Sequence, residues 1–130
     1  MDDTRDLILI VDDDEVSRLI MMEFVKKLGF YPMTLRDGYD INFTCVFFKN
    51  IRAVLLDIMM PKLNGFDACK KIRDICEIQC CKDVLPIIAT TTMDRDKVMI
   101  TNSGFCDHIA KPFQFKCFED CFKKHNIIKF

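Results

Sequence analysis

The stretch Leu7–Asp14, with the sequence LILIVDDD, carries five apolar residues directly into three acids. An apolar run of this length without alternation is typical of a parallel strand that is buried on both faces. The carboxylates at its end must stay in water or pair with a cation. A second run, Ala53–Asp57, also ends in a carboxylate. The carboxyl ends of the strands form the ligand-binding edge of an open α/β sheet, so we expect Asp12, Asp13 and Asp57 to share one acidic pocket.

Apolar runs and helical patterns alternate along the rest of the chain. Strands are expected at residues 7–11, 30–35, 53–56, 84–90 and 106–110, and helices at residues 15–28, 40–48, 66–76, 93–103 and 113–124. Strands that alternate with helices predict an α/β fold, in which a parallel sheet is covered by helices on both faces and joined by right-handed crossovers.

The first of these helices has the clearest boundaries. It is expected to begin near Glu15, where Asp13 or Asp14 can cap its free N–H groups, and to end at Gly29. Asp14 is therefore expected to be a cap or a solvated acid rather than a metal ligand. The apolar residues that recur at helical spacing predict the face that meets the core: Val16, Leu19, Ile20, Phe24 and Leu28.

Length and composition predict one packed domain over residues 1–130, with a polar extension at residues 1–6 and a tail at residues 126–130. Half of the residues are hydrophobic and 30% are charged, which favours a folded core over disorder. The net charge of −1 provides no basic field for direct nucleic-acid binding. The polar N-terminus does not resemble a signal peptide, and no apolar run has the length of a membrane segment. We therefore expect a cytoplasmic domain.

Eight cysteines occur, at positions 45, 69, 76, 80, 81, 106, 117 and 121. Without a signal peptide they are expected to be reduced thiols rather than a disulfide framework. Cys117, Cys121 and His125 stand at i, i+4 and i+8 of a predicted helix, a spacing that suggests a metal stripe. The outer two would lie about 12 Å apart along the helix, which is too far for all three to bind one zinc ion with bonds of about 2.0–2.3 Å.

Four landmarks stand in order along the chain, each at the end of a predicted strand. They are Val11–Asp14, then Leu56–Pro61 with Asn64 and Gly65 after it, then Ile87–Thr92, and finally Lys111–Phe113. One of them alone would be a weak signal, but all four in this order are specific. The chain resembles the receiver domain of two-component response regulators, the CheY-like superfamily, over nearly its whole length.

This resemblance implies a flavodoxin-like (βα)5 sandwich with a five-stranded parallel sheet in the order 2-1-3-4-5. It implies that Asp57 is the phospho-acceptor and that Asp12 and Asp13 bind Mg²⁺, for which Mn²⁺ can substitute. Asp57 itself and the backbone carbonyl of Met59 complete the protein's metal ligands in this likeness. Lys111 is expected to pair with the phosphoryl group as a mobile ammonium.

The resemblance further implies that Thr91 is the switch threonine, with Thr90 and Thr92 as flanking residues. His108 takes the place where the family often has a tyrosine or phenylalanine that moves on activation. The expected donor is a histidine kinase or a histidine phosphotransfer protein. The expected output surface, for a downstream protein or a homodimer, is built by residues 93–103, 106–110 and 113–124.

Other function classes remain as alternatives. A receiver-like interaction module that works without phosphorylation is possible in principle, although the retained Asp12, Asp13, Asp57, Thr91 and Lys111 argue against it. An aspartate-nucleophile phosphohydrolase is disfavoured, because Asp57-Ile58-Met59 lacks a second aspartate and no insertion could form a substrate cap. The likeness implies phosphorylation and dephosphorylation of Asp57 itself rather than turnover of a small substrate. A stand-alone receiver and a piece of a hybrid histidine kinase fit the sequence equally well.

Overall fold

The computed structural model describes residues 5–37, 49–59, 65–78, 85–92, 100 and 102–128. Within them, five parallel strands form one sheet in the order β2-β1-β3-β4-β5. The strands are β1 (Leu7–Val11), β2 (Tyr31–Leu35), β3 (Ile51–Asp57), β4 (Ile87–Thr91) and β5 (Asp107–Ala110). This topology confirms the predicted α/β class and strand order. The predicted helix at residues 40–48, and most of the one at residues 93–103, lie outside the described residues.

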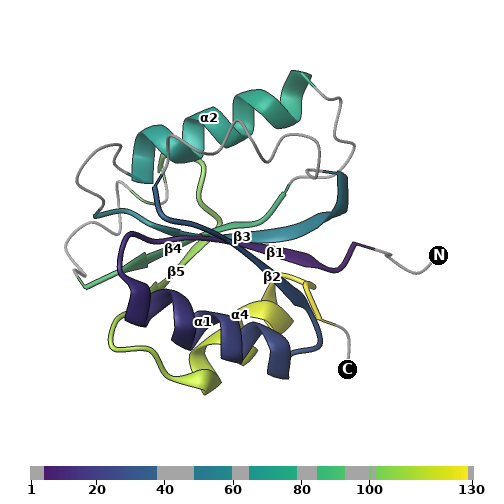
Figure 1. The fold of residues 1–130 in the computed structure, drawn as a ribbon. Helices are drawn as coiled ribbons and strands as arrows, with labels where there is room; N and C mark the ends of the chain where they lie inside the picture. The colour runs from purple at the N-terminus through teal and green to yellow at the C-terminus, as the bar shows by residue number, and fades with distance from the viewer. Residues whose placement is uncertain are drawn as a thin grey trace.

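Helices cover both faces of this sheet. Helix α2 (Gly65–Ile78) lies on one face, and α1 (Glu15–Lys27) and α4 (Phe115–Lys124) lie side by side on the other (Figure 1). The central strands β1 and β3 show no polar alternation, because each of their faces meets a helix layer. None of the helices in the described part of the chain is long and apolar enough to cross a bilayer.

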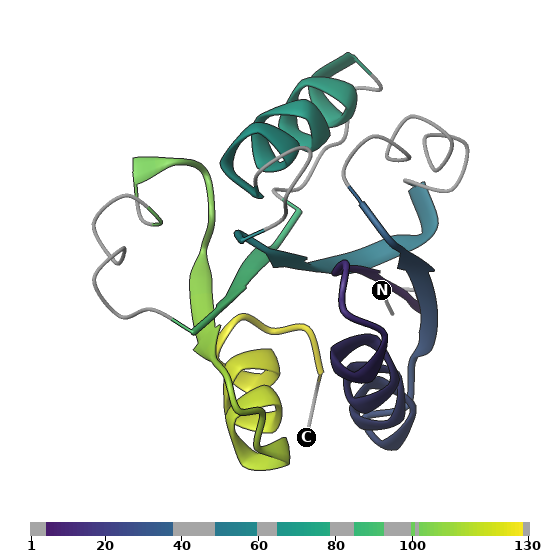
Figure 2. The same cartoon turned by 60° about the vertical axis from the view of Figure 1, so that its left-hand side comes forward.

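The core is divided by the sheet into two apolar clusters. Successive residues of one strand enter opposite clusters, as Leu9 packs towards α2 while Ile8 packs towards α1 and α4. Strand β3 is buried along its whole length, including Arg52. The Arg52 guanidinium donates to the backbone carbonyls of Asn126 and Ile127, each at 3.1 Å. These bonds hold the segment after α4 on the same face of the sheet as α1 (Figure 2).

The predicted apolar face of α1 is partly wrong. Val16, Leu19 and Ile20 are 63%, 54% and 37% exposed, and the buried residues of α1 are Ser17, Met21 and Val25. Those three stand at i, i+4 and i+8, so they form one row along the helix. Both rows of α1 are rich in apolar residues, and helical spacing alone does not decide which one meets the sheet. The predicted Phe24 and Leu28 do pack against the core.

Two strand ends differ slightly from the prediction. Strand β3 continues to Asp57 and β4 continues to Thr91, each one residue further than expected. Asp57 is paired in register with Thr90 of β4, and Thr91 is paired with Ala110 of β5, so these two ladders account for the extensions. Asp57 and Thr91 therefore belong to the ends of strands rather than to the loops that follow.

Candidate functional site

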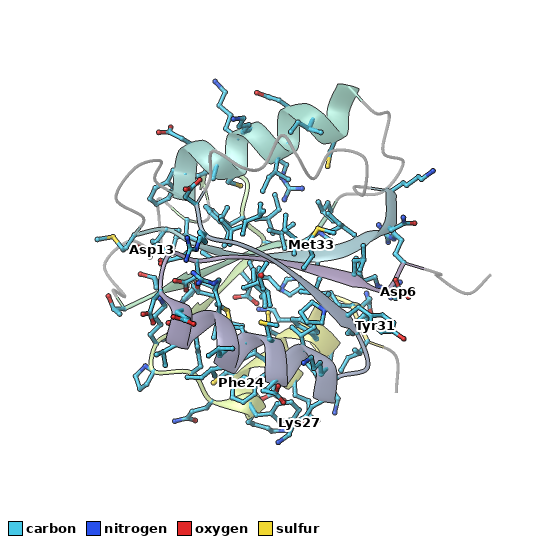
Figure 3. All side chains as sticks on the ribbon, in the orientation of Figure 1. Asp6, Asp13, Phe24, Lys27, Tyr31 and Met33 are labelled. Carbon is cyan, nitrogen blue, oxygen red and sulfur yellow. The ribbon has the colours of Figure 1, made fainter. Side chains whose placement is uncertain are left out.

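Four strands deliver the predicted site residues to one edge of the sheet. Asp12 follows β1, Asp57 ends β3, Thr91 ends β4 and Lys111 follows β5. Because β1, β3, β4 and β5 are parallel neighbours, their carboxyl ends meet at the same edge. Figure 3 shows Asp13 at this end of β1 and Asp6 at the opposite end. The site is therefore assembled by the topology of the sheet from positions far apart in the sequence.

Three carboxylates crowd together at this edge. Oxygen atoms of Asp12, Asp13 and Asp57 all lie within 4.8 Å of one another. Asp12 is fully buried and Asp57 is 3% exposed, whereas Asp13 reaches solvent. Two like charges at this separation repel by about 3–4 kcal/mol at an effective dielectric constant of about 20. Such a cluster is costly unless cations compensate it.

Lys111 supplies the one cation that the structure places between the buried acids in its described part. Its Nζ lies 3.1 Å from Oδ2 of Asp12 and 3.5 Å from Oδ2 of Asp57. Burial lowers the pKa of Lys111, but the neighbouring charges of Asp57 and Asp12 outweigh this effect and raise the pKa above its usual value. Lys111 is therefore held charged, and the peptide bond that follows it, to Pro112, is cis.

Asp57 is the carboxylate with the most unfavourable surroundings. Burial raises the pKa of Asp57 to about 6, and the nearby charges of Asp12 and Asp13 act in the same direction. The hydrogen bond from the backbone N–H of Met59 to Oδ1, at 2.9 Å, and the charge of Lys111 lower it only in part. The Met59 N–H also fixes how the carboxylate is turned. Asp57 is thus poised to gain from added positive charge.

Local hydrogen bonds set the roles of the three successive acids. Oδ1 of Asp12 accepts the backbone N–H of Asp14 at 2.9 Å, and its carbonyl accepts Nη1 of Arg18 at 2.8 Å. Asp14 caps α1 by accepting the N–H and the hydroxyl of Ser17 at 2.9 and 2.8 Å, and these bonds lower the pKa of Asp14. The prediction that Asp14 is a cap is confirmed.

The loop glycine Gly65 lies against the end of β3. A Cβ atom at this position would meet the Cα of Ile58 and would lie 2.6 Å from the carbonyl oxygen of Asp57. The N–H of Gly65 donates to the Ile58 carbonyl at 3.3 Å. Only a glycine permits this approach without a backbone shift, so Gly65 helps to fix the segment that carries Asp57. In the sequence, Gly65 belongs to the second of the four landmarks.

The threonines at the end of β4 flank the acids. The carbonyl of Thr91 accepts the backbone N–H of Lys111 at 2.8 Å, which ties the ends of β4 and β5 together. Thr90 lies beside Asp57 in register and is fully buried. Among the residues that the structure describes, its Oγ1 is a buried side-chain oxygen with no hydrogen-bond partner. An unpaired buried hydroxyl is uncommon and calls for an explanation, so Thr90 belongs with Thr91 among the residues to test.

His108 stands apart from the acidic pocket. It lies in β5, half-buried, and its backbone N–H donates to Oδ1 of Asp107 at 2.8 Å. Its Nδ1 is 4.0 Å from the same oxygen. The sequence did not single out Arg18 or Asp107. Arg18 stands in the first turns of the helix that Asp14 caps, which is a detectable signal, whereas Asp107 gains its partners only through the fold.

Comparisons with known proteins agree with this geometry. Residues 8–121 match the family model described as the response regulator receiver domain. The chain is 32% identical over 118 residues to the "Probable transcriptional regulator ycf27" of Guillardia theta, covering 88% of this chain and 42% of that protein. It is also 32% identical over 108 residues to the alkaline phosphatase synthesis transcriptional regulatory protein PhoP of Bacillus subtilis, covering 82% and 42%. The chain thus spans less than half the length of these curated relatives.

Solved structures show the same fold. The receiver domain of the sensor histidine kinase PA1611 from Pseudomonas aeruginosa superimposes with a TM-score of 0.76 at 25% identity, covering 92% of this chain and 95% of that one. That structure has a magnesium ion coordinated in its active-site cleft. The chemotaxis protein CheY4 of Vibrio cholerae gives a TM-score of 0.78 at 21% identity, covering 92% and 97%.

Proposed function

Because this chain belongs to the response regulator receiver domain family, we propose that Asp57 accepts a phosphoryl group from a phosphohistidine on a histidine kinase or a histidine phosphotransfer protein. The observation that carries the proposal is the placement of Asp57 at a strand end, between two further acids and Lys111. The phosphorylation-independent alternative is not favoured, since an interaction module has no need of a crowded acidic pocket. The proposal concerns the receiver domain alone and does not extend to the activities and partners of the longer relatives.

In the proposed reaction, an ionised carboxylate oxygen of Asp57 attacks the phosphorus atom. A P–O bond forms while the P–N bond of the donor breaks, and the imidazole leaves with the bonding electrons and takes up a proton. The Met59 N–H holds the carboxylate in one orientation. Lys111, whose ammonium donates to the other oxygen, would pair with the incoming phosphoryl oxygens and offset their negative charge. Charged and positioned groups carry most of the catalysis in this class of reaction.

The residues at this edge fit a magnesium ion. Asp12, Asp13 and Asp57, with the backbone carbonyl of Met59, would hold it, and Mn²⁺ can substitute. An all-oxygen donor set with several carboxylates is what hard divalent cations prefer. Burial, with a smaller contribution from the charges of Asp12 and Asp13, raises the pKa of Asp57, and a bound cation would offset both effects. When bound, the ion supplies positive charge that neutralises the phosphoryl oxygens. Asp14 is not part of this set, because its carboxylate caps α1.

We also propose how the modification changes the surface. The Thr91 hydroxyl would donate to the phosphoryl group, and the backbone bond from Lys111 to Thr91 joins the responses of β4 and β5. The output surface would then be residues 93–103, β5 and α4, with His108 as its switch residue, for a downstream protein or a second copy of this chain. Direct contact with nucleic acid is not part of this function.

The extent and location of the domain are part of the same proposal. Residues 1–130 would be one receiver domain, with an extension at residues 1–6 and a tail at residues 126–130. Cys69, Cys106, Cys117 and Cys121 are free thiols. Free thiols in this number suit a reducing compartment, and this supports a cytoplasmic location.

Intact-mass measurement after treatment with acetyl phosphate and Mg²⁺ tests the proposal. The unmodified chain and Asp107→Asn, which removes a carboxylate outside the pocket, should each gain one phosphate. Asp57→Asn should gain none, and omission of Mg²⁺ should abolish the gain in the unmodified chain and in Asp107→Asn. A chain that binds Mg²⁺ but gains no phosphate, either from acetyl phosphate or from a phosphorylated histidine phosphotransfer protein, would contradict the proposal.

A pair of threonine variants tests the switch assignment. Thr91→Val should leave phosphorylation of Asp57 detectable but remove the chemical-shift changes in β5 and α4 that beryllofluoride induces in the unmodified chain. Thr90→Val, at the neighbouring buried position, is the matched control and should retain those changes. The reverse result would assign the switch to the unpaired hydroxyl of Thr90.

A further inference from the structure

A second cluster of metal-binding side-chain types lies between β5 and the end of α4. Ligand atoms of Asp107, Cys121 and His125 are all within 4.8 Å of one another. Cys121 and His125 stand four residues apart and share one side of the helix end, while Asp107 comes from the neighbouring strand. Cys117, Cys121 and His125 cannot all bind one ion. In the fold, the carboxylate of Asp107 on β5 lies beside Cys121 and His125 and provides a third ligand in place of Cys117.

The three side chains converge on a single oxygen atom. Oδ2 of Asp107 lies 2.8 Å from Nε2 of His125 and 3.7 Å from Sγ of Cys121. The other oxygen of Asp107 accepts the backbone N–H of His108 at 2.8 Å, which fixes the carboxylate so that Oδ2 faces α4. A hydrogen bond of this kind behind a ligand is typical of protein metal sites, because it orients the ligand before the ion arrives.

The surroundings leave room for an ion and a fourth ligand. Cys121 is 7% exposed, and the side chains of Asp107 and His125 are 18% and 19% exposed. A cavity of about 320 Å³ is lined by Asp107 and Cys121, together with Cys117, Asp120 and Lys124. Lys124 lies 3.5 Å from Asp107, but its side chain is 69% exposed and can turn away into solvent.

We propose that Asp107, Cys121 and His125 bind one zinc ion. Zinc takes sulfur, nitrogen and oxygen ligands in a tetrahedron, with the fourth position open to water in this arrangement. Bonds of the usual length place tetrahedral ligands about 3.3–3.8 Å apart, so the His125 ring needs to move by roughly half an ångström from its hydrogen-bonded position. On binding, the thiol of Cys121 gives its proton to solvent. Nε2 of His125 also releases the proton that it shares with Asp107, so that the neutral ring carries its remaining proton on Nδ1.

The competing explanation is that the cluster is only a structural hydrogen-bonded contact, here called the staple, that joins β5 to the end of α4. Burial, with the charge of Asp107, raises the pKa of Cys121 to about 12, so the metal-free thiol is a protonated donor. A staple and a zinc site make opposite predictions for added metal. The staple binds none, whereas the zinc site places a thiolate on the ion.

Cobalt titration in excess Mg²⁺ distinguishes the two, because a cobalt–thiolate bond gives a charge-transfer absorption that oxygen ligands do not give. The unmodified chain should show this absorption at one equivalent, and equimolar zinc should remove it. Cys117→Ser, on the same helix beside the cavity, is the matched control and should retain it. Cys121→Ser should lose it, and His125→Gln should weaken cobalt binding by about 10- to 100-fold.

Several results would overturn the zinc site. They are the absence of the absorption in the unmodified chain, its persistence in Cys121→Ser, or its loss in Cys117→Ser. Phosphorylation of Asp57 by acetyl phosphate in each variant reports that the sheet is folded. If Cys121→Ser fails this control, His125→Gln, at a more exposed position, decides the question.

Discussion

Asp57 and Asp107 each lie at the same distance from a lysine, but their pKa values are shifted in opposite directions. Asp57 lies 3.5 Å from Lys111, and Asp107 lies 3.5 Å from Lys124. Burial raises the pKa of Asp57 to about 6, with further help from Asp12. Burial acts on Asp107 in the same direction, but hydrogen bonds from His125 and from the His108 backbone outweigh it and lower its pKa. The deeper burial of Asp57 and its neighbouring acids, together with the hydrogen-bond donors at Asp107, decide the difference; the distance to a lysine does not.

The two clusters should therefore respond to different ions. The Asp57 cluster is rich in acids and poor in donors, so a hard cation adds charge that it lacks. The Asp107 cluster already holds protons between its ligand atoms, so an ion must replace them and must suit sulfur and nitrogen. The proposed magnesium site at the ends of β1 and β3 and the proposed zinc site between β5 and α4 are therefore expected to select different metals.

The largest expected effect concerns magnesium affinity. Asp13→Asn removes one exposed member of the proposed Mg²⁺ ligand set and should weaken Mg²⁺ binding by at least about 10- to 100-fold, the range seen when outer-shell partners of metal sites are lost. Asp107→Asn should leave Mg²⁺ affinity unchanged. Isothermal titration calorimetry of the two variants measures this contrast. Equal losses in both would mean that the clusters do not act separately.

The second effect is a pH dependence with a defined sign. Between the unfolded pKa of 3.8 and the folded pKa of about 6, Asp57 binds more protons in the native state. The stability that this proton supplies, on the order of 1–3 kcal/mol, is present at low pH and is lost as pH rises through that window. In EDTA, Asp57→Asn should therefore be more stable than the unmodified chain at pH 8 and similar to it near pH 4. Urea unfolding followed by circular dichroism measures both, and a less stable variant at pH 8 would contradict the argument.

Asp107 should show the opposite sign and a smaller effect. Its lowered pKa contributes stability that is present above the unfolded value of 3.8 and is lost as pH falls through the lower folded pKa. Asp107→Asn should cost about 1–2 kcal/mol at pH 7 without metal, because His125 and the His108 N–H lose an ionised acceptor. The same unfolding experiment in EDTA should show the cost shrinking below pH 4. A cost that grows on acidification would exclude this cause.

The contrast also explains how much the sequence could predict. Asp12 and Asp57 each follow an apolar run that must be a buried strand, and parallel neighbours bring such ends together. Lys111 follows the last strand in the same way. These residues were therefore predictable from local patterns and the order of the strands.

The rest depended on contacts that no local pattern encodes. Asp107 meets Cys121 and His125 only after α4 has folded back beside β5, so the helical spacing of Cys117, Cys121 and His125 could not reveal Asp107 as their neighbour. In α1, two adjacent rows are apolar, and the row of Met21 and Val25 meets the sheet while Val16 and Leu19 remain exposed. Periodicity predicts that a face is buried, but packing selects the face.

The smallest effect tests whether donors or the lysine keep Asp107 ionised. Lys124 is 69% exposed, and an exposed ion pair contributes little after solvent screening. Lys124→Ala should change the free energy of unfolding by less than about 0.5 kcal/mol, and this change should disappear at about 1 M salt, where charges are screened within about 3 Å. Lys116→Ala, on the same helix and paired with Asp120, controls for the loss of an exposed lysine from α4. If Lys124→Ala instead costs as much as Asp107→Asn, the lysine rather than the hydrogen-bond donors lowers the pKa of Asp107. The difference between the pKa values of Asp57 and Asp107 would then follow only from the crowding of acids around Asp57.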